Sequence, residues 1–314
     1  MKKHPKMLLS LAASGLSAGL LCGAETEAKQ PEAAARKEIA AEKAEPFFRG
    51  IDLLMPMTVT ALYQLPADVK KADARMSRWQ VSAEVAARHA TETGLFYGSL
   101  AYSYTNYHFS GASTNFFGDT ERVLAYARYE QALNRTWGFF VDASGGFAAE
   151  KAANMSDGTF GRLGGGVRYT VSEDLSVFVG AQVLTRMSDS ATVLPHIGFS
   201  WKIDDRWSLN AVNGLVLSYN VYLDRSLRLD LGCTYSNTNF RLRDDSSGRH
   251  QALEIQEVPL ALSATQELGK ASYVRGSVAG LLYSKYKGRS GGNSVGEMKT
   301  DPSVVFGLEA GVRF

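Results

Sequence analysis

The stretch PSVVFGLEAGVRF, residues 302–314, alternates between two kinds of side chain. The apolar set consists of Val304, Phe306, Leu308, Ala310, Val312 and Phe314. The small or charged set consists of Ser303, Gly307, Glu309, Gly311 and Arg313, with Val305 as the exception. Because successive side chains of a β-strand point to opposite faces, this period of two predicts a strand with one apolar and one polar face.

The same alternation recurs from about Leu54 onward, with Gly, Asp, Asn and Ser clustered between the runs. A soluble β-sandwich alternates as well, so the pattern alone does not decide the class of protein. The runs predict strands at 55–64, 77–89, 94–108, 120–133, 136–149, 158–172, 174–187, 192–203, 206–213, 215–223, 226–242, 250–265, 271–286 and 302–314. Many of them exceed the ~5 to 6 residues usual in soluble proteins and reach the ~9 to 11 of a tilted membrane strand.

The connections between these runs alternate in length. Short turns such as 91–94 (TETG) and 204–206 (DDR) are separated by longer polar segments such as 110–120 and 287–300. Short periplasmic turns and longer outer loops are typical of outer-membrane barrels, and an even strand number returns the chain to the periplasm. The predicted fold class is therefore all-β: a transmembrane antiparallel up-and-down β-barrel of about 14 strands in the outer membrane of a Gram-negative cell. Two short runs, and a bulge expected at Pro259, leave 12 strands as an alternative.

The N-terminal region predicts export. Three lysines precede an apolar run and the small residues Cys22, Gly23 and Ala24, so residues 1–24 have the pattern of a signal peptide. Residues 25–50, rich in Ala, Glu and Lys, are expected to form a periplasmic leader, and residues 51–314 the barrel. Only Cys233 then remains, so no intrachain disulfide is expected. The formal net charge of +2 gives no reason to expect a nucleic-acid partner.

Two segments carry a resemblance to known families. The last strand, with Phe306, Val312 and the terminal Phe314, resembles the C-terminal signature of outer-membrane barrels. This resemblance implies recognition by the barrel-assembly machinery. Residues 194–210 (LPHIGFSWKIDDRWSLN) and 218–232 (SYNVYLDRSLRLDLG) are similar to a family of bacterial outer-membrane barrels catalogued as a domain of unknown function. That similarity implies a barrel, and with it contact with outer-membrane lipid and lipopolysaccharide, but no substrate.

An apolar outer face would place the opposite, charged face inside the barrel. An outward Arg at the bilayer midplane costs about 2 to 4 kcal/mol, so deep arginines are expected to point inward. The predicted interior bases are Arg78, Arg88, Arg122, Arg128, Arg162, Arg168, Arg186, Lys202, Arg228, Arg275 and Arg313, and the acids are Glu84, Glu130, Asp142, Asp230 and Glu309. These residues fit two interpretations. The barrel could enclose a water-filled passage that favours anions, or its interior could be filled by Arg–carboxylate pairs, in which case the barrel would conduct poorly. Fourteen strands would leave room for water.

These features predict a porin-like passive channel or uptake pore for small solutes, anions among them. The alternative is a non-conducting structural or surface-interaction barrel, and a lipid-modifying enzyme comes third. The enzyme hypothesis depends on His108 and Ser110, whose spacing resembles a pair in outer-membrane lipid A deacylases, although solvated loop residues explain them as well. No catalytic residue, metal ligand or cofactor is therefore predicted. The sequence leaves the oligomeric state open.

Overall fold

The structure is a computed structural model that describes residues 56–313 except 71, 92, 112–116, 152, 188, 213, 244–250, 270 and 291–292. The predicted signal peptide, the predicted leader and Phe314 lie outside the described residues. The strand segments are β1 (Pro56–Asp68), β2 (Arg75–Ala90), β3 (Gly94–Ser110), β4 (Thr120–Ala132), β5 (Trp137–Glu150), β6 (Thr159–Ser172), β7 (Leu175–Arg186), β8 (Asp189–Lys202), β9 (Trp207–Asn210), β10 (Leu215–Asn220), β11 (Leu227–Cys233), β12 (Ser236–Arg241), β13 (Gln251–Glu267), β14 (Ser272–Ser290), β15 (Asn293–Lys299) and β16 (Ser303–Arg313). A short 3-10 turn, η2 (Met155–Gly158), precedes β6. No helix in the described part of the chain has the length and apolarity needed to cross a membrane.

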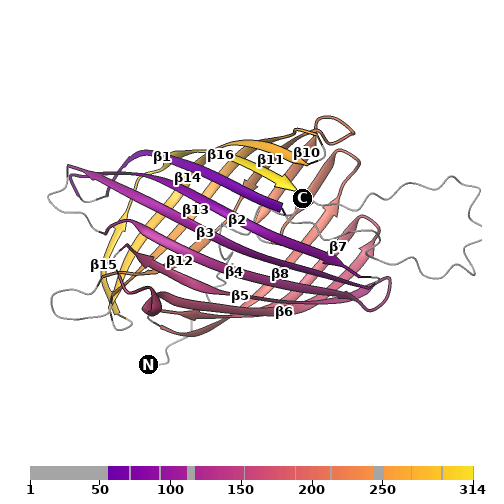
Figure 1. Cartoon of the computed structure of the whole chain (residues 1–314), viewed down its shortest axis with the longest axis horizontal. Coiled ribbons are helices and arrows are strands. Elements are labelled where there is room, and N and C mark those ends of the chain that lie inside the picture. The colour runs from indigo at the N-terminus through magenta and orange to yellow at the C-terminus, as the bar shows by residue number, and fades with distance from the viewer. Residues whose placement is uncertain are drawn as a thin grey trace, which may run out of the picture.

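The strands close into a single antiparallel barrel (Figure 1). Neighbours in sequence pair with one another, β1 pairs with β16, and the pairing of β13 with β14 completes the ring. β11 and β12 both pair with β13, and β15 and β16 both pair with β14, so each of these two couples forms one interrupted strand of the wall. The sixteen segments therefore make a 14-stranded barrel, and the predicted fold class is confirmed.

The structure corrects two details of the predicted strands. Residues 287–300, expected to be a loop, instead extend β14 to Ser290 and form β15. Residues 226–242, expected to be one strand, are interrupted between Cys233 and Ser236. The bulge expected at Pro259 is confirmed, because the register with β14 shifts between Val258 and Pro259.

The short turns are fixed by side chains that bond to the local backbone. In the turn before β5, Asn134 Oδ1 accepts bonds from the backbone N–H groups of Thr136 and Trp137, at 2.9 and 2.8 Å. In the turn before β9, Asp204 Oδ1 accepts from Arg206 and Trp207, both at 2.7 Å. Such Asx turns explain why Asn and Asp stand between the alternating runs.

The outer face of the barrel is apolar and lipid-facing. Along β16, Phe306, Leu308 and Val312 are 49%, 60% and 40% exposed, although large apolar side chains in water-soluble proteins are mostly buried. Aromatic rings pair beside the short turns, Trp137 with Tyr169 at 4.7 Å and Trp207 with Tyr219 at 4.6 Å between ring centroids. Rings at this level suit the interface between hydrocarbon and water. A closed barrel with an apolar belt is an outer-membrane protein, because the backbone groups of a sheet that crosses hydrocarbon must be paired within the ring or shielded from lipid by protein or water.

The apolar belt makes a prediction about Leu308, which lies at the middle of β16. We expect Leu308→Arg to destabilise the folded barrel by about 2 to 4 kcal/mol, because the guanidinium would face hydrocarbon. Leu223→Arg is the control: Leu223 is 66% exposed but lies in the short turn after β10, where the expected effect is about 0 to 1 kcal/mol. Urea titration of the protein folded into liposomes measures both, and equal effects would contradict the placement of the belt.

Candidate functional site

The predicted interior residues occupy alternate positions on the wall, opposite to the exposed apolar set. The described members lie on β2 (Arg78, Glu84, Arg88), β4 (Arg122, Arg128, Glu130), β5 (Asp142), β6 (Arg162, Arg168), β8 (Lys202), β11 (Arg228, Asp230), β14 (Arg275) and β16 (Glu309, Arg313). The backbone of Arg186 ends β7, but its side chain lies outside the described part of the structure. The structure gathers most of the others into two clusters of arginines and carboxylates.

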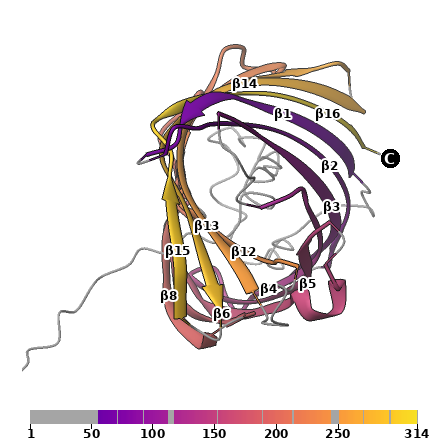
Figure 2. The same ribbon diagram turned by 90° about the vertical axis from the view of Figure 1, so that its left-hand side faces the viewer.

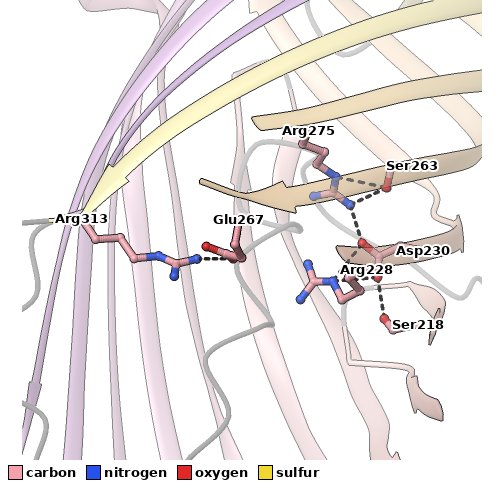
Figure 3. Close-up of polar contacts among 7 residues, drawn as sticks. All are labelled: Ser218, Arg228, Asp230, Ser263, Glu267, Arg275 and Arg313. Atoms are coloured by element: carbon pink, nitrogen blue, oxygen red, sulfur yellow. Dashed lines mark hydrogen bonds and ion pairs between the residues drawn. The ribbon is translucent and has the colours of Figure 1, made fainter. Parts of the chain in front are cut away.

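The first cluster is centred on Asp230 (Figure 3). Arg275 Nη2 lies 3.1 Å from Asp230 Oδ2, and Arg228 Nε lies 3.1 Å from Asp230 Oδ1. Ser218 donates to the same carboxylate at 2.7 Å, and Arg275 donates to Ser263 at 2.8 Å. Two guanidinium groups from β11 and β14 thus share one buried carboxylate.

A smaller polar group lies beside this cluster, toward the short turns. Arg313 Nη2 lies 3.1 Å from Glu267 Oε1, as Figure 3 also shows, and its guanidinium lies 5.4 Å from the ring centroid of Tyr273. Tyr273 in turn donates to Glu309 at 2.8 Å. Glu267 is an interior acid that the sequence reasoning missed, because it ends its strand beside a turn.

The second cluster lies on β4, β5 and β6. Glu130 accepts from Arg128 at 2.7 Å and lies 3.7 Å from Arg168, so again two arginines share one carboxylate. Arg162 Nη2 pairs with Asp142 at 2.9 Å. The Arg128 guanidinium lies 4.6 Å from the ring centroid of the buried Phe140, within the range of a cation–π contact. Paired arginines of this kind agree with the interpretation of an interior that holds many ion pairs, and each shared carboxylate faces two guanidinium groups.

Near the outer end, part of the wall bends across the barrel. We call this part the inward flap; it comprises β12, residues 251–258 of β13, residues 283–290 of β14, and β15. Figure 2 shows β13 and β12 running across the ring toward β4 and β5. The crossing ends in a parallel bridge between Arg241 of β12 and Ala149 of β5. Strands that are far apart around the barrel therefore meet at its outer end.

The inward flap packs against the facing wall through an apolar core. Its buried members come from the flap and from the facing wall: Val69, Ala74, Met76, Tyr107, Phe109, Phe117, Ala148, Phe240, Leu242, Leu253, Ile255, Tyr286 and Met298. Within this core, Arg78 of β2 reaches Glu257 of β13 at 2.9 Å, and the two side chains are only 15% and 9% exposed. Arg78, one of the predicted interior residues, thus contacts the flap, and its partner Glu257 was not predicted.

The opposite surface of the flap is charged. Arg289 lies 2.7 Å from Glu254, and Lys285 and Lys299 lie 2.8 and 3.0 Å from Glu297. Hydrogen bonds from these two lysines lower the pKa of the Glu297 carboxyl to about 2. The flap therefore has an apolar surface toward the facing wall and, opposite to it, a surface on which charged side chains are paired.

The residues of the enzyme hypothesis lie elsewhere. His108 and Ser110 are both exposed at the outer end of β3, on the outward face, and the nearby Asp119 instead accepts from Tyr104 and Asn106. Among the described residues, no group of three His, Cys, Asp or Glu side chains could hold a metal ion. Cys233 is a free, half-buried thiol in the wall. The chemistry gathered in the described part is that of ion pairs, not of a nucleophile beside a base.

A family model described as a domain of unknown function, DUF6268, matches residues 65–291, which is more than half of the chain. The chain belongs to this family. The DUF6268 match runs from β1 through β14 and includes both arginine clusters. The similarity expected from residues 194–232 is confirmed.

Solved structures similar to this member of DUF6268 are outer-membrane barrels. An outer membrane channel from Pseudomonas putida F1 matches 87% of this chain and 100% of its own, with a TM-score of 0.45 and 9% identity. The toluene transporter TodX of Pseudomonas putida matches 84% and 90%, with a TM-score of 0.39 and 9% identity. OprB of Pseudomonas putida matches 84% and 94%, with a TM-score of 0.39 and 10% identity. No curated protein matches the chain in sequence.

Proposed function

We propose that this protein is a passive channel that carries small solutes across the outer membrane through an arginine-rich, anion-favouring lumen. The observation that carries the proposal is the sharing of one carboxylate by two arginines, at Asp230 and again at Glu130. Within each trio the two guanidinium groups outnumber the carboxylate, inside a barrel wide enough to hold water. Fixed cations raise the local concentration of anions and lower that of cations.

Arg228 offers the most direct test of the anion preference. Its side chain is 25% exposed, against 7% for Arg275, so it stands nearer to the solvent of the lumen. We expect Arg228→Gln to lower the chloride-to-potassium permeability ratio about five-fold, since one charge at contact distance contributes about 1 kcal/mol in a watery lumen. The reversal potential in a KCl gradient across a planar bilayer measures this ratio.

Arg75→Gln provides the matched control for this test. Arg75 is paired with Asp68 at 3.1 Å on the outer surface and is 61% exposed, so its removal should leave the ratio unchanged. Cation preference in the unaltered protein, or equal shifts in both variants, would contradict an anion-favouring lumen.

A second function, that of a non-conducting surface barrel, is supported by the closed outer end. The buried Arg78–Glu257 pair joins β2 to β13 across the described outer end, and an apolar core surrounds this pair. A folded protein that carries no solute, even when the flap is released by substitution, would favour this second function over the channel.

The ends of the chain have proposed roles in export and assembly. Phe306 and Val312 lie on the outward face of β16, whose pairing with β1 joins the two ends of the wall. This placement supports Phe306 and Val312 as part of a signal to the barrel-assembly machinery, to which we also assign Phe314. Residues 1–24 as signal peptide and 25–50 as periplasmic leader complete the proposal.

A further inference from the structure

The barrel wall is incomplete beside β8. β8 pairs with β7 along its whole length, from Trp201 opposite Leu175 to Asp189 opposite Arg186. On its other side it pairs with β9 only through Ser200, Trp201 and Lys202, with one further bond from Ala211 N–H to the Phe199 carbonyl. No described residue pairs with this second edge between Val193 and Gly198.

The second edge of β8 is unpaired for two reasons, which lie in β9 and β10 and in β12. β9 and β10 have only 4 and 6 residues, and the tip of their hairpin packs against Gly198, where an added Cβ would lie 2.7 Å from the Ala211 carbonyl. β12, which would otherwise continue the wall, leaves it with the inward flap and reaches β5. We call the unpaired stretch between β8 and β12, above the β9–β10 hairpin, the lateral window.

Pro195 fits the unpaired edge of β8. The Phe199 carbonyl points toward β9, and since backbone groups alternate along a strand, those of Ile197, Pro195 and Val193 point to the same side. Pro195 has no N–H to leave unbonded there, and proline within a sheet is confined to edges of this kind. The sequence of β8 is therefore adapted to a missing neighbour.

The lateral window lies at the depth of the membrane. The outward side chains of β8 are apolar, and Val193 and Ile197 are 67% and 68% exposed, the largest values among the described large apolar residues. From Trp201 at the aromatic level to Val193, a strand tilted by about 40° rises about 20 Å, which stays within the ~25 Å apolar belt. Unpaired backbone at this depth is tolerated where it is buried in protein or lines a water-filled space, and water that reaches the edge of β8 from the lumen would meet the second condition.

The wall behind the window combines aromatic and cationic side chains. His196, on the inward face of β8, lies 5.6 Å from Phe140 between ring centroids, and Phe140 lies under Arg128. The buried His196 Nε2 has no hydrogen-bond partner among the described residues. Apolar side chains at the rim and guanidinium groups behind it would suit a solute with an apolar body and a negative charge.

We propose that solutes pass between the lumen and the outer leaflet through the lateral window, and that they are amphipathic anions such as aromatic or short alkyl carboxylates. This inference rests on the proposed channel function. The axial route is blocked by the apolar core under the inward flap, whereas the window is the place where the wall of the described barrel lacks strand pairing. The guanidinium groups attract the carboxylate, and the lipid-facing rim receives the apolar body.

The first experiment locks the flap shut. Ala149 and Arg241 are direct bridge partners, so cysteines at both positions, in a Cys233→Ala background, lie within the reach of a disulfide. Uptake of labelled benzoate into proteoliposomes should differ by less than two-fold between the oxidised and the reduced protein. A ten-fold loss on oxidation that reductant restores would place the route through the outer mouth and overturn the window.

The second experiment obstructs the window. Ile197→Cys carrying a bulky maleimide should lower benzoate uptake about ten-fold. The control is Val167→Cys with the same adduct. Val167 is 44% exposed, and it lies at the same level of the wall as Ile197, because both residues pair with Val179 of β7. Its own strand, β6, is paired on both sides. Equal uptake in both adducts would contradict passage through the lateral window but would leave the proposed channel function standing. If the unaltered protein carries neither benzoate nor a small hydrophilic anion such as glycolate, the channel function itself fails.

Discussion

Replacement of Glu257 by alanine is expected to open the outer end of the barrel. Glu257 is the only charged partner within 4 Å of Arg78 among the described residues, and it also accepts from Tyr286 at 3.3 Å. Its removal leaves a guanidinium uncompensated inside an apolar core. Loss of one partner from a buried ion pair typically costs about 3 to 5 kcal/mol.

The expected result of Glu257→Ala is a large rise in conductance. Removal of Glu257 destabilises only the closed arrangement of the flap, because Arg78 would be in water when the flap is open. A loss of about 3 kcal/mol shifts a closed-to-open equilibrium roughly a hundred-fold. Single-channel recording should show longer or larger openings than in the unaltered protein, and trypsin should cut the flap faster.

The double variant Arg78→Met with Glu257→Met separates charge from packing. Two apolar side chains of similar length can replace a buried pair with little loss of stability, so this variant should stay closed. If Glu257→Ala conducted no more than the unaltered protein while remaining folded, the flap would not be the barrier. If the double variant opened as widely as Glu257→Ala, the barrier would depend on the ion pair and not on the apolar core.

Much of this architecture could be predicted from period-two alternation. The alternation assigns each side chain to the lipid or to the interior, because the energetic difference between the two environments is large for arginine and for leucine alike. It therefore placed Arg275 of β14 on the same face as Arg228 and Asp230 of β11, although these two strands are not neighbours in sequence. It could not show that Arg275 reaches the carboxylate of Asp230, because contacts between strands depend on register.

The inward flap was missed although the sequence contains a signal for it. In the lower half of β13 the apolar positions are Leu260 and Leu262, whereas above Pro259 they are Leu253 and Ile255, which occupy the opposite face. The apolar face thus changes from lipid to interior at the bulge, as expected where a strand leaves the membrane and packs against the opposite wall. Pro195 was a second unused signal, since proline in the middle of a long strand indicates an unpaired edge.

Replacement of Gly146 by alanine is expected to prevent assembly of the barrel. A Cβ at Gly146 would lie 1.9 Å from the Val123 carbonyl oxygen and 3.1 Å from the Leu124 Cα, both of them backbone atoms of β4. Leu124 is the direct pairing partner of Gly146, so β4 can move away only by breaking its hydrogen bonds with β5. We expect a loss of about 3 kcal/mol or more, at the upper end of overpacking effects, because backbone cannot rotate aside as a side chain can.

Gly145→Ala is the matched control for this prediction, one residue away on the same strand. Its added Cβ would meet only the Phe160 carbonyl, at 3.4 Å, which is an ordinary contact. The heat-modifiable mobility of the folded barrel in gel electrophoresis should persist in Gly145→Ala and disappear in Gly146→Ala. Equal folding of both variants would mean that β4 and β5 are not held at this separation. The second arginine cluster would then lose its structural basis, because Arg128, Glu130 and Asp142 depend on the same pair of strands.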